Sequence, residues 1–195
     1  PWRVGLSIPL SNSSIDQTND RLFDVTVKQL SLSVARLLNK VMFSSTKVGE
    51  ASKGVFVKDA PNVEYETALT FEDVVALETD VMDTGVDVSD GTAAYGKLKT
   101  TRIEAGSPEM ILKDGMMNGY PVLMTNYMGA GELGFGVFSN VGIGQWGKIR
   151  LVVDDTSMAD TDETKFTLNS KYDIVVARPE AFAIAKKKTA TPAKA

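Results

Sequence analysis

The 195-residue sequence contains no histidine and no cysteine. Without imidazole groups, the chain cannot form a Ser-His-Asp or Cys-His catalytic system, nor can it supply histidine ligands to a metal. Without thiols, it cannot form disulfides, zinc–cysteine sites or iron–sulfur sites. An enzyme built from this chain would therefore depend on carboxylates, lysine, tyrosine or serine.

The sequence also has no apolar run near the roughly 20 residues needed to span a bilayer, and no basic-then-apolar leader opens it. Hydrophobic residues make up 43% and charged residues 24%, and the net charge is −4. These values are ordinary for globular proteins, so we expect a soluble chain with no membrane partner. Because the first residue is Pro rather than Met, we also expect a processed or partial chain with further residues before Pro1.

The N-terminal part predicts a strand followed by a long helix. Apolar residues alternate with small or polar ones over residues 2–10, the period of a strand with one buried face. Ser14 and Gln17 have the spacing of a capping box, which predicts a helix over residues 16–43, about 42 Å long. We expect its packing face to be the apolar residues that recur at helical spacing: Phe23, Val27, Leu30, Val34, Leu37 and Val41.

The middle of the chain predicts a loop and a second helix. Residues 44–69 are polar and broken by Gly and Pro, which indicates a connecting loop. Thr70 and Asp73 predict the N-terminus of a helix of about 13 residues, and Gly85 offers a left-handed stop.

The remainder predicts strands and tight turns. The expected elements are strands at 110–112, 120–124, 165–168 and 172–177, turns at 114–115 and 118–119, a helical turn at 179–185 and a flexible Lys-rich tail at 186–195. A run of helices followed by many strands favours the α+β fold class.

The glycines Gly129, Gly131 and Gly134 match the Gly-x-Gly-x-x-Gly pattern of dinucleotide sites, with Asp154 twenty residues beyond. Such a site needs a helix directly after the glycines, because the amides and dipole of its N-terminus hold the pyrophosphate. The residues that follow include Gly136 and then three more glycines, and they do not favour a helix. Turn glycines in a β-rich segment explain the match better.

Carboxylates concentrate between residues 154 and 163 and could bind a hard cation such as calcium. Their spacing is not that of an EF-hand, so a solvated acidic loop is the simpler interpretation. No pair of carboxylates is singled out for catalysis. We therefore predict no catalytic residue, cofactor or metal ion.

Four strings in the C-terminal half resemble the major capsid proteins of tailed bacteriophages, which have the Hong Kong 97 fold. They are Asn-Gly-Tyr-Pro-Val at 118–122, Gly-Phe-Gly-Val-Phe-Ser at 134–139, Tyr-Asp-Ile-Val-Val at 172–176 and Arg-Pro-Glu-Ala-Phe at 178–182. The resemblance implies five parts: a returning strand of the extended loop at 1–12, a peripheral domain with the spine helix at 13–69, a mainly axial domain at 70–135, strands returning to the peripheral domain at 136–185, and the tail at 186–195.

The resemblance further implies a non-enzymatic structural subunit. Such a subunit assembles with its own copies into hexamers and pentamers of an icosahedral shell around viral DNA, which it contacts without sequence specificity. Portal, scaffold and decoration proteins are implied partners, the virion is the implied location, and assembly takes place in the host cytoplasm. The family normally has an N-terminal arm and the outgoing strand of the extended loop before this point, so we expect these segments to be missing from the given sequence, and we expect the segment at 92–99 to be compressed or incomplete.

Two alternatives stay open. A bacterial nanocompartment shell protein would have the same fold. A small carboxylate-based or nucleotide-binding enzyme would use the region from Gly129 to Gly147.

Overall fold

The computed structural model describes residues 1–18, 20–66, 68–95 and 110–188. The described residues form an α+β fold, as the sequence predicted, and the chain divides into two compact units. Unit 1 comprises Pro1–Val41, Val48–Ser52 and Ile143–Val175, and unit 2 comprises Met42–Lys47, Lys53–Gly142 and Val176–Ala195. Residues 42–47, 53–69, 136–142 and 176–185, which the resemblance assigns to the peripheral domain, lie in unit 2.

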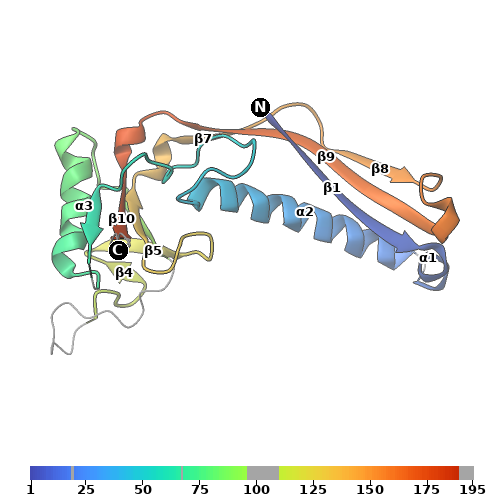
Figure 1. Ribbon diagram of the computed structural model, residues 1–195, viewed down its shortest axis with the longest axis horizontal. Helices are drawn as coiled ribbons and strands as arrows, with labels where there is room; N and C mark the ends of the chain where they lie inside the picture. The colour runs from blue at the N-terminus through green and yellow to red at the C-terminus, as the bar shows by residue number, and fades with distance from the viewer. Residues whose placement is uncertain (19, 67, 96–109, 189–195) are drawn as a thin grey trace, which may run out of the picture. The chain divides into compact units, whose positions relative to one another are not determined.

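Unit 1 is built on two long antiparallel strands, β1 (Trp2–Ser11) and β9 (Glu163–Val176). Their register pairs Trp2 with Tyr172 and Ser11 with Glu163. On the other side of β9 lie β7 (Val141–Gln145) and β8 (Arg150–Asp154). Helix α2 (Asp20–Phe43) runs along this sheet (Figure 1).

The core of unit 1 follows from the alternation of the two long strands. Every second side chain of β9 from Thr164 to Ile174 is buried, and Val4 of β1 is buried with them. Leu30 and Val34 of α2 complete this cluster. The other face of the sheet therefore carries the polar and small residues of both strands.

The helical segment starts earlier than the sequence predicted. Helix α1 (Asn12–Thr18) follows β1 directly, so Ser14 and Gln17 lie inside a helix and the predicted capping box is wrong. The cap is Ser11, whose hydroxyl accepts a hydrogen bond from the amide of Ser14 at 3.4 Å. The predicted end at Phe43 is confirmed.

Unit 2 contains a six-stranded sheet in the order β2-β10-β6-β3-β5-β4. Its strands are β2 (Val63–Tyr65), β3 (Thr92–Tyr95), β4 (Met116–Met117), β5 (Tyr120–Met124), β6 (Leu133–Gly136) and β10 (Phe182–Lys187). Helix α3 (Phe71–Asp83) packs against β10, β6 and β2 (Figure 1). β2 falls inside the predicted loop at 44–69, because three residues carry too little pattern to reveal a strand.

Helix α3 begins and ends as predicted. Thr70 and Asp73 form a reciprocal capping box, and the buried side chains are Val74, Leu77 and Val81. Gly85 adopts the left-handed conformation expected after the helix, with φ of 76°.

The turns and the strand around β5 also match the prediction. Positive φ angles occur at both residues of each predicted turn, at Asp114 and Gly115 and at Asn118 and Gly119. Strand β5 has the predicted bounds. Residues 110–112 do not form the predicted strand: Met110 is a single bridge residue, and an isolated bridge joins Lys113 to Met116.

The end of the chain differs most from the prediction. The two strands expected at 165–168 and 172–177 are one continuous strand, β9. The helical turn expected at 179–185 is a short 3₁₀ turn (Pro179–Ala181) followed by the buried strand β10. Lys186 and Lys187, expected in the tail, belong to β10, and the tail from residue 189 lies outside the described residues. The segment at 92–99 begins as β3, and its continuation from residue 96 also lies outside them.

Candidate functional site

The predicted packing face of α2 is buried only along part of its length. Leu30 and Val41 are 1% exposed and Val34 is buried, whereas Val27 and Leu37 are half-buried. Phe23, at the N-terminal end, is 43% exposed, although its ring contacts that of Phe166 edge to face at 5.8 Å. Of these buried side chains, Leu30 and Val34 belong to the core of unit 1, so this part of the stripe supports the sheet.

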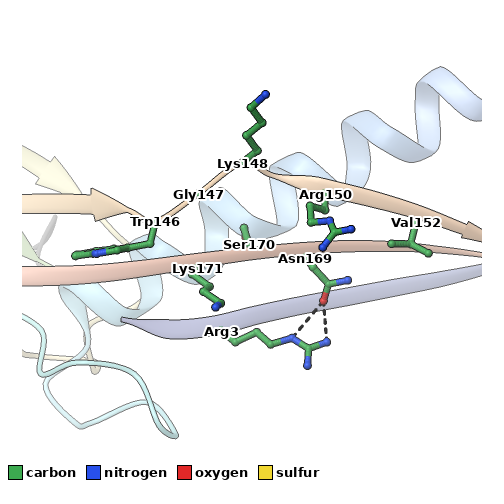
Figure 2. A pocket seen from close by; sticks show the side chains of 9 residues that line it. All are labelled: Arg3, Trp146, Gly147, Lys148, Arg150, Val152, Asn169, Ser170 and Lys171. Carbon is green, nitrogen blue, oxygen red and sulfur yellow. Dashed lines mark hydrogen bonds between the residues drawn. The ribbon is translucent and has the colours of Figure 1, made fainter.

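The polar face of the unit 1 sheet carries a hollow of about 440 Å³. Its cationic side chains are Arg3 from β1, Lys148 and Arg150 from the β7–β8 turn and β8, and Lys171 from β9 (Figure 2). Trp146 and Val152 supply its apolar part. We call these six side chains the cationic groove.

Strand register brings these residues together. Arg3 lies opposite Lys171 in the β1–β9 ladder, and Arg150 lies opposite Asn169 in the β8–β9 ladder. Side chains opposite each other across neighbouring strands point to the same face. Residues about 150 positions apart in sequence therefore share one surface.

Asn169 fixes the guanidinium of Arg3. Its Oδ1 accepts hydrogen bonds from Nη2 at 2.8 Å and from Nε at 3.3 Å (Figure 2). Gly5 lies beside this pair, and a Cβ there would come within 3.4 Å of Asn169 Oδ1. A Cβ there would thus make ordinary van der Waals contacts with Asn169 and Arg3 and displace neither.

Trp146 forms one end of the cationic groove. Its amide donates to the carbonyl of Lys171 at 2.9 Å, which anchors the β7–β8 turn on β9. Its indole ring lies so close to Gly144 that any Cβ there would collide with it. The ring nevertheless remains 45% exposed, so it offers an apolar surface beside the cations.

The groove has a one-sided charge. Its lining includes four cations and no carboxylate, and within the described part of the chain none of the four forms an ion pair. Such a surface attracts an anionic partner that also presents apolar groups. The groove therefore combines positive charge with an exposed apolar surface.

Helix α3 in unit 2 presents the opposite charge. Glu72, Asp80 and Asp83 border a shallow depression on its outer side, together with Val75 and Ala76. The helix contains five carboxylates and no lysine or arginine. We call this surface the acidic face of α3.

The glycines of the dinucleotide-like pattern have structural roles. Gly134 lies in β6 against the ring of Phe56, so a strand and not a helix follows the pattern. Gly131 has φ of 83°, and its carbonyl accepts a hydrogen bond from the hydroxyl of Tyr65. Glu132 holds the turn by accepting from the amide of Gly129 at 2.8 Å. The geometry therefore lacks the helix N-terminus that a pyrophosphate site requires.

Asp154, the acidic residue of that pattern, belongs to unit 1 and closes its own turn. Its Oδ1 accepts hydrogen bonds from the amides of Ser157 and Thr156, both at 3.0 Å, and these bonds hold the pKa of the carboxyl well below its usual range. Among the residues that the structure describes, no group of three or more acidic side chains is placed to hold a metal ion. Over the same residues, no helix is long and apolar enough to cross a membrane.

Sequence reasoning missed the cationic groove. Arg3, Lys148, Arg150 and Lys171 are scattered in the sequence and match no motif. Only the pairing of β1 with β9 could have revealed them, and that pairing is a long-range contact.

Comparisons with known proteins bear on the whole chain. A family model described as the phage capsid family matches residues 3–187. The major capsid protein of Halomonas phage phiHAP-1 is 26% identical over 181 residues, which cover 84% of this chain. The chain spans only 30% of the length of that relative.

Solved capsid structures share the fold. A capsid chain of the empty GTA particle superposes with a TM-score of 0.74 at 14% identity, covering 96% of this chain and 72% of that chain. A chain from the structure of Mycobacterium phage Adephagia gives a TM-score of 0.72 at 15% identity, covering 98% and 73%. The fold class expected from the resemblance is therefore confirmed. Because the family model spans residues 3–187, the chain belongs to the phage capsid family.

Proposed function

We propose that the chain is a structural subunit of a bacteriophage capsid, and that its copies assemble into hexamers and pentamers of an icosahedral shell around the viral DNA. The observation that carries this proposal is the match of the capsid family model to residues 3–187. The likeness of the fold to solved capsid chains supports it.

The division into two units supports a peripheral and an axial domain, with residues 42–47, 53–69, 136–142 and 176–185 assigned to the axial one. Unit 1 corresponds to the peripheral domain, with α2 as its spine helix and β1 as the returning strand of the extended loop. Unit 2 corresponds to the axial domain. In such a subunit the two domains offer different surfaces to neighbouring copies, so that heterologous contacts close into rings.

The proposed role is not enzymatic and needs no cofactor. The partners are other copies of the chain, packaged DNA bound without sequence specificity, and portal, scaffold or decoration proteins. The location is the virion, after assembly in the host cytoplasm. The net charge of −4 supports weak contact with DNA, because phosphate binding depends on cationic surface.

Neither alternative is favoured by a specific observation. A nanocompartment shell protein of the same fold differs in its cargo, and genes for a terminase or portal beside this one would decide for the phage. An enzyme in the region from Gly129 to Gly147 would need a ligand, and those glycines instead form turns and contacts with aromatic rings. Nucleotides and divalent cations should therefore not shift the melting temperature, whereas a ligand at 100 times its Kd would add about 2.7 kcal/mol to the free energy of unfolding.

Electron microscopy tests the main proposal. The chain, with all residues that its gene encodes on either side, should form rings, capsomers or shells when purified and concentrated. Sedimentation velocity supplies the control, because it reports assemblies in solution without a support film. A strictly monomeric protein at high concentration would contradict the proposal.

A further inference from the structure

We infer that the cationic groove of one copy binds the acidic face of α3 in a neighbouring copy. This inference rests on the proposed function, because it names one contact through which copies of the chain would assemble. It assigns a surface of unit 1 and a surface of unit 2 to opposite sides of one heterologous interface.

The groove needs an anionic partner. Arg3 of β1 and Lys171 of β9 lie opposite each other. Arg150 lies on the same face of the sheet, in strand β8, which pairs with the other edge of β9. Like charges opposite each other across strands destabilise a sheet, and no carboxylate lines the groove to offset them. Docked carboxylates would convert this repulsion into attraction.

The charge of the acidic face of α3 is only partly offset within the chain, where the side-chain amide of Asn62 donates to Asp80 and Lys58 lies close enough to attract it. Asp80 and Asp83 lie in the last turn of the helix, where the helix dipole places partial negative charge, and this turn contains no basic residue. Within the described residues, neither aspartate forms an ion pair. Cations from another copy would offset both the two carboxylates and the dipole.

The apolar groups favour a protein partner over nucleic acid. Trp146 and Val152 are 45% and 43% exposed in the groove, and Val75 is 37% exposed on α3. These side chains could cover one another at the centre of an interface whose charges lie around them, the usual arrangement in protein interfaces. A phosphate backbone would leave Val152 in contact with charged groups.

Charge reversal tests the contact. Arg150→Glu with Lys171→Glu should weaken self-association at least tenfold by sedimentation velocity, because both side chains are exposed and face the proposed carboxylates. Adding Asp80→Lys with Asp83→Lys should restore association. The matched control, Lys28→Glu with Arg36→Glu, makes the same charge change on exposed positions of α2 and should associate like the unmodified chain. Circular dichroism and melting temperature verify that every variant folds.

Each result separates the inference from the proposed function. If the unmodified chain assembles and the groove variant assembles equally well, the inference is overturned and the proposed function stands. If the groove variant assembles normally but loses retention of duplex DNA, the groove binds a polyanion and the inference is again overturned. If the unmodified chain never assembles, the proposed function fails.

The absence of cysteine allows a second, direct test that does not depend on complete assembly. Two full-length variants, Val152→Cys and Val75→Cys, are mixed and treated with a short bismaleimide. We expect a cross-linked dimer containing one copy of each, identified by mass because one variant carries a tag. The control mixes Val75→Cys with Val25→Cys, whose position is exposed on α2. Its yield of mixed cross-linked dimer should be at most a tenth of the yield with Val152→Cys. Equal yields, or links only between identical variants, would overturn the inference.

Discussion

Gly134 and Gly136 show how single residues set the packing of unit 2. A Cβ on Gly134 would collide with the ring of Phe56, and one on Gly136 with the ring of Phe182. Phe56 and Phe182 are fully buried and contact each other edge to face at 6.1 Å. The two glycines therefore let aromatic rings lie directly on the backbone of β6.

Gly134→Ala should lower the free energy of unfolding by about 1–3 kcal/mol, the usual cost of overpacking a dense core. Chemical denaturation measures the change. Gly5→Ala is the matched control, because its Cβ would meet no atom closer than 3.4 Å in a strand of unit 1, and its stability should change by less than about 1 kcal/mol. Equal losses for both variants would show that the Phe56 ring is free to move aside.

Tyr120 illustrates how one hydrogen bond alters a titration. Its hydroxyl donates to Glu78 Oε1 at 2.6 Å. This bond, together with burial and the negative charge of Glu78, raises the pKa of Tyr120 from 10.0 to about 12. Because the pKa in the folded state is the higher one, the stabilisation is complete below pH 10 and is lost as the pH rises from about 10 to about 12.

In a pH titration, phenolate absorbance is measured for the unmodified chain and for Tyr120→Phe, and the difference between them reports Tyr120 alone. This difference should have its midpoint near pH 12, under conditions where circular dichroism shows that the protein is folded. Glu78→Gln should move this midpoint toward 10, because it removes the negative charge beside the phenol. A midpoint near 10 in the unmodified chain would contradict the structure.

At the scale of an element, a few buried side chains hold helix α2 on the sheet of unit 1. Only part of its apolar stripe reaches the sheet, with Leu30 and Val34 buried against Val4 and Phe166. The exposed Val25 lies on another side of the helix. The free energy that holds α2 on the sheet is therefore concentrated in a few side chains.

Leu30→Ala should cost about 2–5 kcal/mol of unfolding free energy, because it removes a fully buried side chain and leaves a cavity. Val25→Ala is the control and should change stability by less than about 0.5 kcal/mol. Thermal and urea denaturation followed by circular dichroism measure both. A loss below about 1 kcal/mol for Leu30→Ala would indicate that α2 is held elsewhere.

Elements with local signals could be predicted from the sequence. The capping box at Thr70 and the turns at 114–115 and 118–119 depend on residues within four positions of one another. Strand β10 was mistaken for a helical turn because it is buried on both faces and rich in alanine, so it shows no alternation. Strand β9 was divided in two because the polar residues 169–171 interrupt its apolar pattern, although they continue its alternation of faces.

The cationic groove could not be predicted from the sequence, because it depends on a long-range strand pairing. Arg3 meets Lys171 only through the register of β1 and β9. No local pattern encodes that pairing. The resemblance to a family predicted the fold class, but it did not predict the positive charge of this surface.

At the scale of the whole molecule, charge predicts how assembly responds to salt. Raising the ionic strength from about 0.1 M to about 1 M shortens the Debye length from about 10 Å to about 3 Å. If the groove binds α3, self-association should weaken over this range, as measured by sedimentation velocity. Association of the Arg150→Glu, Lys171→Glu variant should depend less on salt. An unmodified chain that associates equally at both ionic strengths would contradict an interface of this kind.

The division of the chain into units also determines whether one unit can be produced as a separate fragment. The backbone passes between the units five times, after Val41, Lys47, Ser52, Gly142 and Val175. A gene fragment for unit 1 alone would have to join three separate stretches, and no single proteolytic cut could release either unit as an independent piece. Evolution by exchange of one whole unit is correspondingly difficult, so we expect inserted sequence to enter at loops within a unit rather than replace it.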